Sequence, residues 1–266
     1  MRKNNAEETL FSYGDFYYRK NNPIRISNEG IITSQNTIIG YIYDGEVSNG
    51  EMYYNFLVLT MQDFKSQKSW KTHKKQLAEA ANKCGYMVIF VPNIDIFTGF
   101  ENNESLSSSQ SFGVRYYQTF PEIFEGLIKV AKYSQDNDLQ TACWAAISDK
   151  FAESDCIFAY NQLIDGEYVH AEEILCRYLE CKTYESRLFV TLLEPCVDCL
   201  QRMVNAGAET IFFGHTHKKK WDTREYIDYT NNIFYREVKS NRGRPIVFRK
   251  WCNSKVDKFY APKEVK

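Results

Sequence analysis

The chain has 266 residues, of which 44% are hydrophobic and 25% charged, so its composition is that of a folded globular protein and excludes a disordered one. Its 33 lysines and arginines balance 34 aspartates and glutamates, which excludes a global positive field for nucleic acid or anionic membranes and leaves only local patches. The first residues lack the apolar stretch of a signal peptide and no uncharged apolar run could span a bilayer, so we expect a soluble, cytoplasmic protein without a membrane partner.

The N-terminal part of the chain is predicted to form a small α/β or α+β unit, residues 1–113, of unknown role. The expected elements are strands at 36–45, 53–61 and 86–92 and a helix at 68–85. Residues 101–113 (ENNESLSSSQSFG) are polar, serine-rich and without periodicity, which predicts a linker. The linker separates this unit from a second domain, residues 114–266, in keeping with a length greater than one average domain needs.

The second domain shows a clearer alternation of helical and strand-like patterns. Helices are expected at 121–134, 170–180 and 195–207, and strands at 141–149, 155–163, 187–194 and 209–214. A polar break between the first two strands indicates that they pair as a hairpin. The order of elements predicts an α/β fold, in which helices flank a mixed sheet.

The eight cysteines are expected to be reduced, because no secretion signal accompanies them. Six lie in apolar surroundings and are interpreted as small core residues: Cys84, Cys143, Cys156, Cys176, Cys181 and Cys252.

Cys196 and Cys199 differ from the other cysteines, because they follow Pro195 in the first turn of a predicted helix. Residues three apart share one helix face, and a helix N-terminus favours the thiolate, so the pair forms half of a zinc site. A catalytic zinc takes about three protein ligands and leaves a position for water. His170, at the start of the preceding helix, can supply the third ligand if both helices cover the same face of the sheet.

Together the two segments HAE (170–172) and PCVDC (195–199) reproduce the zinc-deaminase signature H-x-E followed by P-C-x-x-C. Residues 120–240 thus resemble the cytidine deaminase-like superfamily, whose fold is a three-layer α/β/α arrangement. The stretches AKYSQDNDLQTACWAAISD and CIFAYN are similar to deoxycytidylate deaminases. TLLEPCVDC and IFFG are more similar to tRNA adenosine deaminases and related base deaminases.

The resemblance implies a role for each residue of the signature. His170, Cys196 and Cys199 would bind Zn²⁺, which would make a hydroxide nucleophile from its bound water. Glu172 would be the proton shuttle. Asn161 would contact the sugar, although an ordinary turn asparagine is an equal alternative.

Two histidines follow the last predicted strand, where superfamily members place residues that face the substrate. His215 and His217 are therefore candidate substrate-binding residues, and surface histidines are the alternative. A zinc finger made from the cysteine pair and these histidines is disfavoured, because HTH separates the histidines by one residue and fingers use three to five.

The favoured function is hydrolytic deamination of a small-molecule cytosine nucleoside or nucleotide, such as dCMP or cytidine. A polynucleotide deaminase acting on adenine or cytosine in RNA or single-stranded DNA is the runner-up. It is supported by the TLLEPC and FFG features and by local basic runs at residues 65–75, 218–224 and 236–251. A non-catalytic zinc-stabilised binding module is a third hypothesis.

The N-terminal unit could shape the substrate entrance or a homo-oligomer contact. Its order of His73, helix, strand and Pro92 also allows a degenerate second deaminase-like unit, with chance similarity as the alternative.

Overall fold

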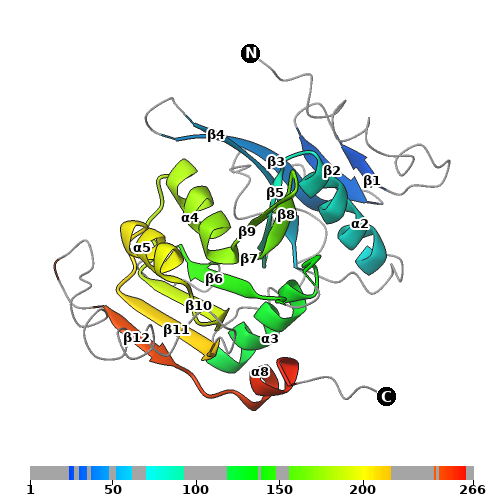
Figure 1. The fold of residues 1–266 in the computed structure, drawn as a ribbon. Coiled ribbons are helices and arrows are strands. Elements are labelled where there is room, and N and C mark those ends of the chain that lie inside the picture. Colours follow the sequence, from blue (N-terminus) through cyan, green and yellow to red (C-terminus); the bar gives the residue numbers. More distant parts are fainter. Residues whose placement is uncertain are drawn as a thin grey trace, which may run out of the picture.

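A computed structural model describes residues 24–26, 30–34, 37–47, 52–61, 70–92, 119–136, 139–147, 156–216, 243 and 246–261 (Figure 1). The expected linker at 101–113, the basic run at 218–224 and His217 lie outside these residues.

The described chain alternates between strands and helices much as the sequence predicts. The first half forms β1 (Ile24–Ile26), β2 (Ile31–Ser34), β3 (Thr37–Glu46), β4 (Tyr53–Thr60), α2 (Trp70–Lys83) and β5 (Met87–Val91). The second half forms α3 (Phe120–Ala131), β6 (Ala142–Ala146), β7 (Cys156–Tyr160), β8 (Gln162–Ile164), β9 (Glu167–Val169), α4 (Ala171–Cys181), β10 (Leu188–Leu193), α5 (Val197–Asn205), β11 (Thr210–His215), β12 (Val247–Lys250) and α8 (Ser254–Phe259).

The strands form one ten-stranded sheet of order β1-β2-β3-β4-β5-β7-β6-β10-β11-β12, beside a separate β8-β9 hairpin (Figure 1). Neighbouring strands are parallel in the pairs β4-β5, β10-β11 and β11-β12 and antiparallel elsewhere. The predicted hairpin is confirmed, because β6 and β7 pair antiparallel over their whole length. The sheet is mixed and the α/β fold class is confirmed.

Helices cover both faces of the sheet and give a three-layer arrangement. The side chains of α2, α3 and α8 pack with one apolar cluster, and those of α4 and α5 pack with the other. Strand β10 contributes side chains to both clusters. Val190 and Leu192 face the first cluster and Phe189 faces the second, because successive side chains of a strand point to opposite faces of the sheet. No helix in the described ranges is both long and apolar enough to cross a bilayer.

The β8-β9 hairpin was not among the predicted elements. Its two strands are joined by Asp165 and Gly166, which both have positive φ angles, of 50° and 86°. An Asp-Gly pair in this backbone conformation is the preferred connection of a two-residue hairpin. The hairpin turns the chain back after β7 and delivers it to His170 at the start of α4.

The two halves of the chain join within the sheet, through β5 and β7. Their ladder contains the pair Phe90 and Phe158. The side chain of the buried Gln162 forms further hydrogen bonds to the main chain of β5. The Gln162 Oε1 accepts hydrogen bonds from the Val88 N–H (2.7 Å) and from Asn82 Nδ2 (2.6 Å), and its Nε2 donates to the Val88 carbonyl (2.7 Å). Strands from both sides of residue 113 therefore share one sheet, and the proposed domain division stays a prediction.

All eight cysteines are free, and their burial largely follows the prediction. Cys143, Cys156, Cys176 and Cys181 are buried and Cys84 is half-buried. For Cys252 the expectation was wrong, because its side chain is exposed where the chain leaves β12 and turns into α8.

Candidate metal centre

Two helix starts meet at the candidate site. His170 is the N-cap of α4 and Cys196 is the N-cap of α5, both with extended backbone, and neither side chain caps its helix. The helices themselves begin normally, because the His170 and Cys196 carbonyls accept the first helical hydrogen bonds from Ile174 and Leu200. An imidazole and a thiol are poor substitutes for the usual Ser, Thr, Asp or Asn cap. The side chains of His170 and Cys196 therefore suit metal binding better than helix capping.

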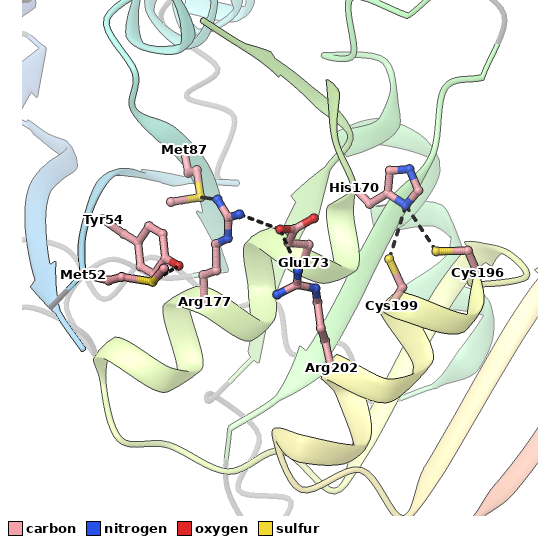
Figure 2. Close-up of polar contacts among 9 residues, drawn as sticks. All are labelled: Met52, Tyr54, Met87, His170, Glu173, Arg177, Cys196, Cys199 and Arg202. Carbon is pink, nitrogen blue, oxygen red and sulfur yellow. Dashed lines mark hydrogen bonds and ion pairs between the residues drawn. The ribbon is translucent and has the colours of Figure 1, made fainter. Parts of the chain in front are cut away.

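The donor atoms of His170, Cys196 and Cys199 all lie within 4.8 Å of one another. The His170 Nδ1 is 3.3 Å from the Cys199 Sγ and 3.6 Å from the Cys196 Sγ (Figure 2). Bonds of about 2.1 Å to nitrogen and about 2.3 Å to sulfur at tetrahedral angles place the two donor atoms about 3.6 Å apart. The observed spacing and the His/Cys/Cys donor set therefore fit a zinc ion.

The three donor groups shift one another's pKa values. Hydrogen bonds with Cys199 and then His170 lower the pKa of Cys196 to about 4, against the effect of burial. The same contact with Cys196 raises the pKa of Cys199, and a hydrogen bond with Cys196 raises the pKa of His170 to about 9. Cysteine binds metal ions as the thiolate, so the lowered pKa of Cys196 suits a metal ligand.

Glu172 lies in the first turn of α4 and is only 4% exposed. Burial raises the pKa of its carboxyl, whereas the positive charge of His170 and a hydrogen bond with Cys199 act in the opposite direction. Burial, and then the nearby charge of Glu172, raises the pKa of the Cys143 and Cys176 thiols. Glu172 therefore places a carboxyl group beside the three donors but outside their cluster.

Asn161 follows β7 and its side chain is bound to the main chain of a neighbouring segment. Its Oδ1 accepts a hydrogen bond from the Thr141 N–H (3.0 Å) and its Nδ2 donates to the Leu139 carbonyl (2.9 Å). These bonds hold the segment before β6 against the end of β7. The predicted contact with a sugar stays a prediction.

His215 is the last residue of β11, where a following loop position was expected. Its carbonyl accepts a hydrogen bond from the Glu194 N–H (2.9 Å), so it adjoins the segment that leads to Cys196. Its ring stacks on Tyr260 with centroids 5.1 Å apart, and its Nδ1 lies 3.3 Å from the Asp257 Oδ1. Neither neighbour could be predicted from the sequence, because α8 reaches His215 across 42 residues of chain and carries no motif.

Comparisons with known proteins gave matches among solved structures alone. No protein-family model and no curated protein sequence matches the chain. The dCMP deaminase from the cyanophage S-TIM5, in apo form, matches at 13% identity over 50% of this chain and 100% of its own, with a TM-score of 0.31. The same enzyme in complex with dCMP and dUMP matches at 13% identity over 50% of this chain and 99% of its own, with a TM-score of 0.26. At this level of similarity, the function of the chain has to be inferred from its own site.

Proposed function

We propose that this protein is a zinc-dependent deaminase of the cytidine deaminase-like superfamily, and that it acts on a cytosine nucleoside or nucleotide. The observation that carries the proposal is the convergence of one imidazole and two thiols at two helix starts, with the buried carboxyl of Glu172 beside them. Within the described ranges three donors converge, as in catalytic zinc sites, whereas structural sites use four. A buried carboxyl that is not a ligand suits proton transfer better than structural support.

The chemistry can be assigned to the residues of the site. His170, Cys196 and Cys199 would hold the zinc ion, which would supply a Lewis acid that activates water near neutral pH. Glu172 would accept a proton from the attacking water and deliver it to the ring nitrogen beside the amino-bearing carbon. As the carbon–nitrogen bond breaks, Glu172 would take the remaining proton from the added hydroxyl and pass it to the departing amine, and the hydroxyl oxygen would become the carbonyl oxygen. Water and the amine are thereby converted into a carbonyl group and ammonia.

The choice of a small-molecule substrate is supported by the stretches AKYSQDND and CIFAYN, which resemble deoxycytidylate deaminases, and by the near-neutral net charge. A polynucleotide substrate is the second candidate, and one surface observation favours it. The edge strand β12 exposes Arg249 and Lys250, and the adjacent Trp251 is 37% exposed. Cations next to an aromatic ring suit the phosphates and bases of a single strand.

The two candidates separate in one experiment. Zinc-loaded protein is incubated with dCMP, cytidine, dCTP and a mixed-sequence oligonucleotide, and products are followed by chromatography together with ammonia release. We expect conversion of a free cytosine compound. Conversion confined to the oligonucleotide, with a steep loss at higher salt, would favour the second candidate. Full zinc binding without deamination of any cytosine or adenine compound would support a non-catalytic binding module instead.

A further inference from the structure

A second charged cluster lies one helical turn behind the metal ligands. The carboxylate of Glu173 on α4 contacts two guanidinium groups through the same oxygen, Oε1. Arg177 Nη2 of the same helix lies 2.5 Å away, and Arg202 Nη2 of α5 lies 3.4 Å away. Figure 2 shows Glu173 between the two arginines, beside the ligands. The carboxylate therefore connects the two helices whose first turns carry the metal ligands.

The sequence positions of this bridge match those of the ligands. Glu173 follows His170, the N-cap of α4, by three residues, and Arg202 follows Cys199 by three residues on α5. Residues three apart on a helix lie on the same side, about one turn from each other. The contact between Glu173 and Arg202 thus repeats, one turn deeper, the approach of His170 to Cys199.

We infer that Glu173 and Arg202 are positioning residues of the metal centre, an inference that rests on the proposed function. Their contact fixes how α5 is placed along α4, and this placement sets the distance between the His170 Nδ1 and the two sulfur atoms. Neither residue belongs to the cluster of three donors. Groups that orient metal ligands in this indirect way contribute to metal affinity.

The first half of the chain contacts the same bridge through Arg177. The Arg177 guanidinium lies 4.8 Å from the centre of the Tyr54 ring on β4, and its Nη1 is 3.9 Å from the Met87 Sδ on β5. Arg177 thus contacts Tyr54 and Met87 of the N-terminal strands and Glu173 of its own helix α4 (Figure 2). The N-terminal strands thereby support the helix that begins at His170.

The test compares zinc affinity in Glu173→Gln, Arg202→Gln and the double variant, by competition with a chromophoric chelator. The Arg202 side chain is 49% exposed, so solvent weakens its pairing and we expect a loss near the lower end of the usual range, about 10-fold for each single variant. The double variant should lose little more than Glu173→Gln alone, because that variant already removes the contact with Arg202 together with the one to Arg177. Arg202→Lys keeps the charge and should recover part of the affinity.

Two controls separate positioning from general damage. Glu180→Gln removes an exposed carboxylate from α4, and Lys129→Gln removes an exposed cation from α3, and both should bind zinc as the wild type does. The melting temperature of each metal-free variant reports folding. The absorption spectrum of the cobalt-substituted protein reports ligand geometry, and we expect it to change in the Glu173 and Arg202 variants alone.

Unchanged zinc affinity and an unchanged cobalt spectrum in Glu173→Gln and Arg202→Gln would overturn the inference. Losses that simply add in the double variant would also overturn it, because the two residues would then act separately. Failure of the wild type to bind zinc would contradict the proposed function itself. If the wild type binds zinc and the variants bind it equally well, only the positioning role is contradicted.

Discussion

The Nδ1 of His170 lies 3.3 Å from the Sγ of Cys199, although 29 residues separate the two in the chain. The intervening segment runs down α4, through β10 and into α5, so both residues return to the same edge of the sheet at the start of a helix. Because rigid elements hold both ends, the two donors are kept at the spacing that zinc ligands require.

Removal of a ligand should abolish metal binding without unfolding the protein. Cys199→Ser replaces a buried thiolate donor by a hydroxyl, which is a much poorer zinc ligand. We expect the wild type to bind zinc with equimolar stoichiometry and Cys199→Ser to retain little after dialysis, as measured by metal analysis. Cys252→Ser is the matched control, because that thiol is exposed on a different segment. Equal zinc in both variants would show that Cys199 is not a ligand.

Replacement of the neighbouring carboxyl should separate catalysis from metal binding. Glu172→Gln keeps the size of a side chain that is 4% exposed but removes its ability to transfer protons. General acid–base groups contribute roughly 100- to 10,000-fold to rate, so turnover should fall by that order while zinc content stays unchanged. Glu180→Gln, exposed on the same helix, should retain full activity. Loss of zinc together with activity in Glu172→Gln would contradict the assigned role.

The convergence of His170, Cys196 and Cys199 could be predicted because its signals are local. Pro195, the spacing of Cys196 and Cys199, and the placement of His170 before a helical pattern all act within a few residues. The β8-β9 hairpin could also have been predicted, since Asp165 and Gly166 are the residues that a tight turn requires.

The remaining features depend on contacts between distant segments, which local patterns do not encode. Nothing near Phe90 indicates that it pairs with Phe158, because many apolar strands could offer the same edge. Tyr260 reaches His215 only because the chain returns to the sheet as β12 and α8. The link from Glu173 to Arg202 likewise requires knowing how closely two helices pack.

Alkaline unfolding should report the contact between β3 and α4. The hydroxyl groups of Tyr41 and Tyr178 lie 3.1 Å apart in the interior, and burial raises the pKa of Tyr41 to about 12. Because the unfolded side chain ionises near pH 10, the folded state holds its proton more tightly between about pH 10 and pH 12. Stability is therefore unaffected below pH 10 and falls as pH rises through this window.

Tyr41→Phe tests this assignment, since phenylalanine keeps the ring and cannot ionise. We expect the variant to lose less stability than the wild type between about pH 10 and pH 12, as measured by urea unfolding at each pH. Tyr53→Phe, at an exposed tyrosine on β4, should behave as the wild type. Parallel pH curves for Tyr41→Phe and the wild type would place the alkaline sensitivity elsewhere.

The junction between β5 and β7 should be sensitive to Gln162. Its side chain satisfies the main-chain N–H and carbonyl of Val88 and an amide N–H of Asn82, all in a buried region. Gln162→Leu has a similar volume but leaves these groups without partners, and each such loss costs about 1–3 kcal/mol. We expect the free energy of unfolding to fall by about 3 kcal/mol or more in urea titrations. Gln201→Leu, exposed on α5, should change the free energy of unfolding little.

If the two halves were independent units, Gln162→Leu would split the unfolding transition in two, whereas one shared sheet predicts a single transition at lower urea.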